Sequence, residues 1–190
     1  MFKLLNQSFF ERSTLQVAPE LLGKTIVLRQ TRNQRKFGII VEVEAYTNDD
    51  PACHAARGKT SRNEVMFGPG GYSYVYFIYG MYHCLNFVTE KKGIPGAVLI
   101  RALEIPNKDP RLASGPGKLC KYLKITKKHN NLNCCEDDSP LIVTNNTSYK
   151  SRTFSVVQTE RVGISQATHY PWRWYMEDSH SVSKIIKKRV

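Results

Sequence analysis

The sequence predicts a single α+β domain in which an antiparallel or mixed β-sheet carries peripheral helices. Its 190 residues suit one domain, and a domain of this size buries about 70% of the surface that its unfolded chain exposes. Several short apolar segments have the length and composition of strands. Most of these segments are joined by short polar connections, which favour antiparallel neighbours over a doubly wound fold.

Each predicted element follows from apolar spacing and turn residues. Residues 14–22 place apolar side chains at helical spacing after Ser13, a suitable N-cap, although Pro19 interrupts the pattern. The remaining predicted elements are strands at 25–30, 37–46, 72–79, 83–88, 97–105, 141–144 and 154–158, and a helix at 114–125 with a glycine-rich entry. The polar segment TRNQRK joins the first two strands and predicts a hairpin there.

The charge of the chain points to a polyanionic partner. Lysine and arginine number 28 against 16 acidic residues, which leaves a formal net charge of +12. Such a surplus favours nucleic acid as the partner. A basic enzyme with no such partner remains the alternative at this point. The basic tail from about residue 180 to 190 is expected to be mobile.

The remaining composition favours an intracellular protein. No apolar run reaches the ~18 residues that cross a bilayer, so we expect no membrane contact, and the first residues lack a secretory signal. The five cysteines include the adjacent pair Cys134–Cys135, which suits neither a disulfide framework nor a zinc site. We therefore expect reduced thiols and no zinc site at the cysteines.

Charged residues within two predicted strands suggest an ion pair. Side chains alternate along a strand, so Glu42, Glu44 and Tyr46 share one face of the 37–46 strand. Arg101 stands in the middle of an apolar strand, and a buried guanidinium needs an anionic partner. Glu44 and Glu104 are the candidates. The pair is either purely structural, or Arg101 orients a carboxylate and a water for chemistry.

The stretch GPGGYSYVYFIYGMYHCLNF (68–87) contains five of the ten tyrosines in the chain. Tyr72, Tyr74 and Tyr76 share one strand face, which is either a half-buried surface with its hydroxyls at water or a stacking surface. Tyr79 falls where the hairpin turns, so its ring should be exposed. An exposed aromatic side chain at a hairpin tip contributes little to stability but suits a wedge between stacked bases.

Two loops carry cations that suit phosphate. The loop CHAARGKTSRN (53–63) contains His54, Arg57, Lys59 and Arg62, and no second histidine or acid stands at a metal-ligand spacing from His54. The SGPGKL segment lacks the spacing of a nucleotide-binding phosphate loop. Its glycine-rich helix start with Lys118 is suited to one backbone phosphate.

Six motifs in this order carry a resemblance: Glu44-Ala45-Tyr46, CHAARGKTSRN, Met66-Phe67, YVYFIYGMYHCLN, Ile100-Arg101-Ala102-Leu103-Glu104 and SGPGKLC. Together they closely resemble the alkyladenine DNA glycosylase family, the 3-methyladenine-DNA glycosylases of the eukaryotic type. The resemblance covers roughly residues 15 to 175. It implies one compact domain with a curved, mostly antiparallel sheet and a protruding β-hairpin. It also implies removal of damaged purines from DNA without metal or cofactor.

The resemblance implies roles for three residues in the chemistry. Glu44 matches the general base of the family. Arg101 matches the arginine that holds the attacking water. Val162, in the segment Arg161-Val162-Gly163, matches a valine whose carbonyl also contacts that water.

The resemblance also implies how a flipped base is held. Tyr46 and Tyr76 match the aromatic side chains that sandwich the base, and His54 matches the histidine that completes the pocket. Asn86 matches the asparagine that crowds the position of the guanine 2-amino group. Tyr79 matches the hairpin tyrosine that fills the gap left in the duplex.

The expected activity is base-excision repair by a monofunctional purine DNA N-glycosylase. The expected partner is double-stranded DNA that contains damaged purines of the 3-methyladenine, 7-methylguanine, hypoxanthine and etheno-adenine class. We expect a monomer in the bacterial cytoplasm or the nucleus, and an intact abasic site as the product. A non-catalytic basic nucleic-acid-binding module is the main alternative, and a basic enzyme acting on small nucleosides is a third.

Overall fold

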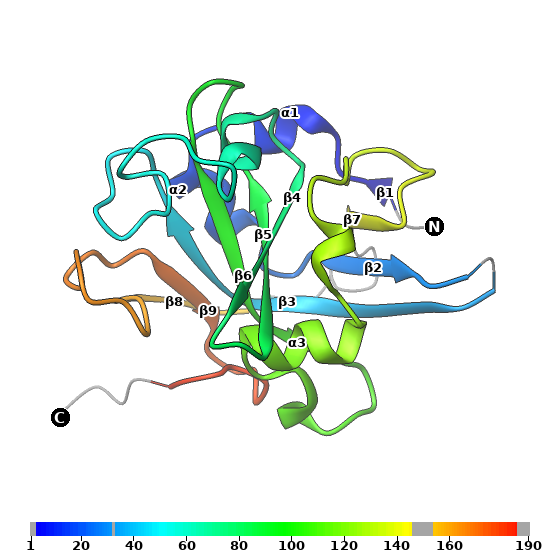
Figure 1. Ribbon diagram of the computed structural model, residues 1–190. Helices are drawn as coiled ribbons and strands as arrows, with labels where there is room; N and C mark the ends of the chain where they lie inside the picture. Colours follow the sequence, from blue (N-terminus) through cyan, green and yellow to red (C-terminus); the bar gives the residue numbers. More distant parts are fainter. Residues whose placement is uncertain (1–2, 32, 146–153, 186–190) are drawn as a thin grey trace, which may run out of the picture.

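The computed structural model describes residues 3–31, 33–145 and 154–185, and these fold around one curled antiparallel sheet. Its described strands are β1 (Lys3–Leu4), β2 (Thr25–Arg29), β3 (Arg35–Tyr46), β4 (Ser73–Ile78), β5 (Tyr82–Val88), β6 (Ala97–Glu104), β7 (Leu141–Asn145), β8 (Val156–Thr159) and β9 (Arg173–Met176). The strand order is β1-β7-β2-β3-β6-β5-β4, and β9 pairs with both β3 and β8. Figure 1 shows β4, β5 and β6 running steeply, whereas β2 and β3 run nearly horizontally in the same view.

Short helices lie at the periphery of the sheet. They are α1 (Gln7–Phe10), α2 (Thr14–Glu20) and α3 (Pro116–Leu123), with 3₁₀ turns η1 (Glu64–Phe67), η2 (Pro110–Ala113) and η3 (Lys127–His129). Helix α2 packs against β3 and β6, and α3 packs against β5 and β6. Buried residues of α2 and α3 join strand residues in one core cluster. No helix within the described ranges has the length and apolarity needed to cross a membrane.

Strand β3 is the central element of the sheet, and its pairing with β6 is irregular. Ile40 pairs with Leu103 and Glu42 pairs with Ala102, but Val43 pairs with Ile100. Arg101 therefore has no partner in this register. A bulge of this kind bends a strand and redirects a side chain, and bulges are frequent beside functional sites. Here the irregularity coincides with the acidic residues of β3.

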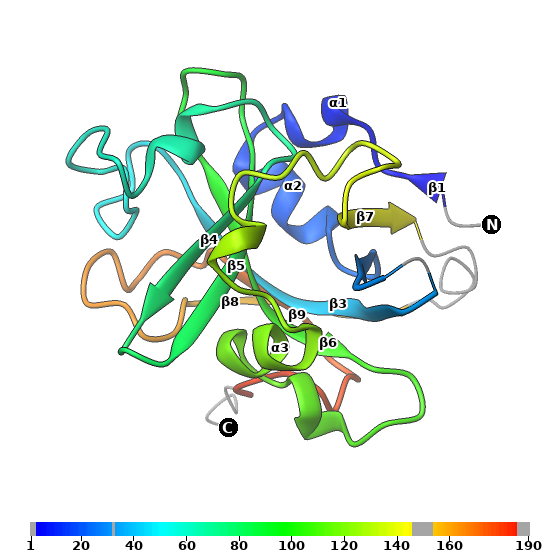
Figure 2. The ribbon, with the colours of Figure 1, turned by 45° about the vertical axis from the view of Figure 1, so that its right-hand side comes forward.

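The predicted fold class is confirmed, and every strand pairing among the described residues is antiparallel. Each predicted strand and helix is present, with ends that differ by a few residues. Strand β9 was not predicted, and it adds a pairing to the middle of β3. Ser13 makes no side-chain cap bond, although it does occupy the N-cap position of α2. The β4–β5 hairpin extends outward from the rest of the molecule (Figure 2).

The end of the chain differs from the expected mobile tail. Ser181 and Val182 are buried, and the backbone N–H of Ser183 donates to Glu42 at 2.6 Å. This part of the tail is packed against the sheet because it satisfies a buried carboxylate. Residues 186–190, which hold the basic end of the predicted tail, lie outside the described residues.

Candidate active site

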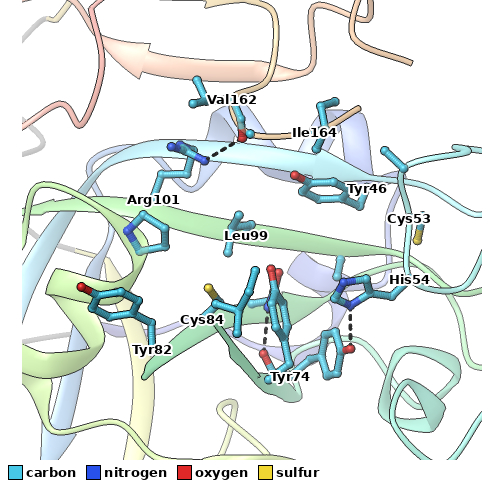
Figure 3. Close-up of a pocket in the computed structure, with 18 of the residues that line it drawn as sticks. Tyr46, Cys53, His54, Tyr74, Tyr82, Cys84, Leu99, Arg101, Val162 and Ile164 are labelled. Carbon is cyan, nitrogen blue, oxygen red and sulfur yellow. Dashed lines mark hydrogen bonds between the residues drawn. The ribbon is translucent and has the colours of Figure 1, made fainter. Parts of the chain in front are cut away.

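A pocket of about 750 Å³ opens between three segments that are distant in sequence. It is lined by the loop after β3, by the β4–β5 hairpin and by the segment after β8, with the start of α3 closing one side. Figure 2 shows the first three of these on the same side of the molecule. Figure 3 shows the aromatic and polar side chains that point into the cavity. A cavity of this size is sufficient for a purine nucleoside.

A buried group of charges lies at one wall of the pocket. Arg101 Nη1 is 3.2 Å from Glu44 Oε1, and Arg101 Nε donates to Glu42 Oε1 at 2.9 Å. Both carboxylates are fully buried, whereas Arg101 reaches the pocket wall. Burial lowers the pKa of Arg101, but the charges of Glu44 and Glu42 outweigh it, so the pKa lies above its usual value. The guanidinium therefore stays charged.

One of the two predicted partners of Arg101 is confirmed and the other is not. Glu44 is a partner, as expected. Glu42 is the second partner and was missed, because a single acid on an alternating strand is most often solvated. Glu104 instead accepts a hydrogen bond from Ser179 at 3.2 Å. The bulge at Arg101 explains the difference, because it turns the guanidinium toward the acids of β3.

Val162 binds to both members of the ion pair through its backbone. Its N–H donates to Glu44 Oε1 at 2.7 Å, and its carbonyl accepts from Arg101 Nη1 at 3.4 Å. The second of these bonds is drawn in Figure 3. The Tyr46 hydroxyl donates to Glu44 Oε2 at 2.9 Å. Glu44 thus accepts two hydrogen bonds and forms an ion pair with Arg101.

A second buried ion pair supports the Tyr46 ring. Arg161 and Asp50 bind through two contacts, one of them 2.9 Å from Arg161 Nη2 to Asp50 Oδ1, and both side chains are fully buried. Arg161 also donates to the Ala45 carbonyl at 2.9 Å. Its guanidinium carbon is 4.7 Å from the centre of the Tyr46 ring. The sequence did not predict a role for Asp50, because its partner Arg161 is far away in the chain and the loop that contains Asp50 does not indicate it.

The remaining pocket residues form an aromatic group with a neutral histidine. The Tyr74 hydroxyl and His54 Nδ1 are 2.8 Å apart, and the rings of His54 and Tyr76 are 4.6 Å apart at 71°. Burial and the Arg62 charge lower the pKa of His54. Burial raises the pKa of Tyr74 to about 12. At neutral pH His54 is therefore uncharged and Tyr74 protonated. The Asn86 amide donates to the Tyr74 carbonyl at 3.0 Å, and its side chain lines the pocket.

Tyr79 stands at the tip of the hairpin, as predicted. It is 78% exposed, and it lines the outer part of the pocket. Tyr79 and Gly80 have φ values of +54° and +67°, the left-handed pair that is typical of a type I′ hairpin turn. A positive φ is uncommon for a tyrosine. The turn therefore keeps the Tyr79 ring in solvent even though its positive φ is energetically unfavourable. This combination favours a binding role for the ring.

The predicted phosphate-binding cations surround the pocket unevenly. Arg57 and Lys118 are among its lining residues. Arg62 is exposed, with its guanidinium carbon 5.6 Å from the centre of the Tyr76 ring. Lys59 is exposed beside Phe67, at 6.0 Å. Cys84, a lining residue that was not predicted, is buried, which raises the pKa of its thiol.

Comparison with known proteins identifies the family. The sequence profile of the methylpurine-DNA glycosylases matches residues 8–180. The chain belongs to this family. A protein of Trichodesmium erythraeum is 43% identical over 96% of this chain and 98% of its own length. One of Ehrlichia chaffeensis is 48% identical over 92% and 94%, and one of Rickettsia felis 45% identical over the same shares.

All three relatives are provisionally named as 3-methyladenine DNA glycosylases. Membership of the methylpurine-DNA glycosylase family confirms the resemblance seen in the sequence and places the chain among the DNA glycosylases of base-excision repair. Within the described parts of the chain, no group of three or more histidine, cysteine, aspartate or glutamate residues is arranged to hold a metal ion.

Proposed function

We propose that the protein is a monofunctional purine DNA N-glycosylase that flips a damaged purine out of duplex DNA and hydrolyses its bond to deoxyribose. The observation that carries the proposal is the 3.2 Å pair of Glu44 and Arg101 at the wall of an aromatic pocket of purine size. A binding module would have no use for a fully buried carboxylate at such a wall. A nucleoside hydrolase would have no use for an exposed Tyr79 at the hairpin tip.

Base flipping is energetically feasible at this site. Extrusion of a nucleotide costs a few kcal/mol, and less at a damaged pair. Each base–aromatic contact returns about 1–3 kcal/mol. Tyr46 and Tyr76 line the pocket and supply two such contacts, and Tyr79 supplies a third in the gap left by the base. Three contacts offset the cost, whereas one does not.

Glu44 is arranged to bind one water molecule. An ionised carboxylate has about four lone-pair positions. The Val162 N–H and the Tyr46 hydroxyl each donate to one position on Glu44, and the Arg101 guanidinium pairs with the carboxylate beside them. We propose that one water, bound at the pocket wall formed by Arg101 and Val162, takes the remaining position. The Val162 carbonyl, 3.4 Å from Arg101 Nη1, supplies a second acceptor for that water beside the guanidinium.

Hydrolysis then proceeds with few groups. The bond between the purine nitrogen and C1′ breaks as the electron pair leaves with the base, and positive charge develops on the sugar as in glycoside hydrolysis. Glu44 stabilises that charge and accepts a proton from the water whose oxygen bonds to C1′. Because water is the nucleophile, the product is an intact abasic site.

The pocket favours purines that carry positive charge or lack the guanine 2-amino group. Electron-rich rings attract cations, so Tyr46 and Tyr76 suit 3-methyladenine and 7-methylguanine. The buried Asn86 side chain leaves little space in the pocket where the 2-amino group of guanine would lie. This favours hypoxanthine and etheno-adenine over normal guanine. The bacterial sources of the relatives favour the bacterial cytoplasm over a nucleus as the site of action. We expect the enzyme to act as a monomer and without a cofactor.

The test is a set of duplexes that each contain one hypoxanthine, etheno-adenine or 7-methylguanine, with an undamaged duplex as control. Free base is measured by chromatography and abasic sites by alkaline strand cleavage. Release of free base from damaged duplexes alone supports the proposal. Tight binding with no free base identifies a binding module instead. Strand cleavage before alkali, with borohydride trapping of the chain on DNA, contradicts the monofunctional assignment.

A further inference from the structure

The buried carboxylate of Glu42 has no part in the chemistry above, yet it is the most heavily bonded acid beside the pocket. Its Oε1 accepts from Arg101 Nε at 2.9 Å, from Arg173 Nε at 2.7 Å and from the Ser183 hydroxyl at 2.9 Å. Its Oε2 accepts from the Ser183 backbone N–H at 2.6 Å. Four donors from three distant segments therefore converge on one side chain.

These contacts hold Arg101 through residues that do not line the pocket. Arg101 Nε donates to Glu42, and Arg101 Nη2 donates to the Ser183 hydroxyl oxygen at 3.3 Å. Only Nη1 points to Glu44 and to the Val162 carbonyl. A guanidinium is a planar group with donors in fixed directions. Fixing Nε and Nη2 therefore fixes the place where Nη1 meets Glu44.

Charge also favours this arrangement. Two buried guanidinium groups, Arg101 and Arg173, face two buried carboxylates, Glu42 and Glu44. Because Glu42 accepts from both arginines, Arg101 contributes only one nitrogen to Glu44. Without the Glu42 charge, the two guanidinium groups would have Glu44 as their only carboxylate in this group. Arg101 would then be free to turn toward Glu44 and cover the position needed by a water.

We propose that Glu42 and Ser183 are positioning residues for base release, acting through Arg101, and that the segment after β9 is thereby part of the catalytic apparatus. This inference rests on the proposed function. Neither residue touches the pocket, so both act on the rate of base release rather than on the capture of DNA. A purely structural ion pair would instead change stability and leave the rate of the folded enzyme unaltered.

The first experiment uses Ser183→Ala, because this change leaves the Glu42 charge and the backbone N–H in place. Ser179→Ala is the matched control, since Ser179 lies in the same segment and bonds to Glu104 at 3.2 Å. We expect Ser183→Ala to slow single-turnover base release about 10-fold, the lower end of the loss found when groups that orient metal ligands are removed. Ser183→Thr keeps the hydroxyl and should restore the rate. Equal rates for Ser183→Ala and Ser179→Ala overturn the inference.

The second experiment is a double-mutant cycle with Glu42→Gln and Arg101→Met. Residues that act through one another show non-additive effects. We expect Glu42→Gln to slow release by about 10–100-fold in the wild-type background, and by less than about 3-fold when Arg101 is already Met. The affinity of Glu42→Gln for lesion duplexes should stay equal to that of the unaltered chain, because Glu42 does not line the pocket. Additive effects overturn the inference.

The two failures are distinguishable. If the unaltered chain releases no base from any damaged duplex, the proposed function is wrong. If the unaltered chain is active but the effects of Glu42→Gln and Arg101→Met on the rate of base release are additive, only the positioning role of Glu42 and Ser183 is wrong. If Glu42→Gln does not fold, the Ser183 variants decide the question, because Ser183 is partly exposed and its hydroxyl contributes little bulk.

Discussion

The backbone N–H of Val162 donates a 2.7 Å hydrogen bond to Oε1 of Glu44, across 118 positions of the chain. The carbonyl of the same residue accepts from Arg101. One peptide segment therefore fixes the carboxylate and the guanidinium relative to each other. Its position is set in turn by Arg161, whose guanidinium is buried against Asp50 and the Ala45 carbonyl. The loop after β8 is thus as much a part of the site as the strands that carry the charged residues.

The first prediction concerns the carboxylate. Glu44→Gln keeps the size of the side chain but removes the base and the charge that stabilises the sugar cation. We expect single-turnover base release to fall by about 10²–10⁴-fold, while affinity for a lesion duplex stays within a few-fold. Glu20→Gln is the control, because Glu20 lies on α2, outside the pocket lining, and pairs with Arg12. Undiminished release by Glu44→Gln would remove Glu44 from the mechanism.

The second prediction concerns the hairpin tip. Tyr79 is 78% exposed, so Tyr79→Ser should leave the melting temperature nearly unchanged, as for other surface substitutions. Loss of a stacked ring should weaken the binding of a lesion duplex by about 1–3 kcal/mol, which is roughly 5- to 150-fold in Kd. Phe37→Ser tests for a general effect of an exposed ring, because Phe37 is 40% exposed on β3 and lies outside the pocket lining. Equal affinities of the two variants would contradict the wedge.

The sequence was sufficient for every described strand except β1 and β9, and for the positions of several candidate site residues on them. Alternation placed Glu44 and Tyr46 on one face, and the turn chemistry of Tyr79-Gly80 exposed the tyrosine. Glu42 was missed because alternation shows which face a residue takes but not what covers that face. Its partners Arg173 and Ser183 lie 131 and 141 positions away. The bulge at Arg101 could not be predicted from the sequence either, because it depends on the register in which β6 pairs with β3.

The third prediction concerns stability. Asp50→Ala leaves the Arg161 guanidinium buried without its carboxylate, and breaking such a pair costs about 3–5 kcal/mol. For a chain of this size we expect the melting temperature to fall by roughly 6–20 °C. Asp109→Asn is the matched control, because it removes the charge of the exposed Asp109–Arg111 pair but keeps the side-chain oxygen that caps η2, and it should not change the melting temperature measurably. A small shift for Asp50→Ala would mean that water reaches Arg161.

The fourth prediction separates phosphate contacts from base contacts. Each neutralised phosphate contributes about 0.9 to the slope of log K against log salt. Replacement of Arg57, Lys59, Arg62 or Lys118 by Ala should lower the slope by about one for each residue that contacts a phosphate. Binding should weaken alike on damaged and undamaged duplexes, in titrations at several salt concentrations. Lys36→Ala is the control, since Lys36 lies over the Tyr122 ring at 4.8 Å. A residue that behaves like Lys36 has no phosphate contact.

The fifth prediction follows from the lowered pKa of His54. Its ordinary pKa is 6.5, and burial together with the Arg62 charge lowers it, so the imidazole is neutral at pH 7 and gains a proton only as the pH falls below 6.5. Protonation would add a positive charge 4.6 Å from the centre of the Tyr76 ring, where a cationic purine is expected to stack. We therefore expect the rate of 7-methylguanine release, relative to hypoxanthine release, to fall as the pH is lowered from 7.5 to 5 in steps of about half a unit.

The ratio is the appropriate measure because any effect of pH that is common to the two substrates cancels. Protonation of the neutral hypoxanthine leaving group also lowers the ratio in acid, but this contribution does not depend on His54. His54→Gln keeps a polar group near Tyr74 but cannot gain a positive charge. The release ratio of this variant should therefore depend on pH only through protonation of the hypoxanthine leaving group. If His54→Gln and the unaltered chain show the same pH dependence, the charge of His54 has no part in distinguishing cationic from neutral bases.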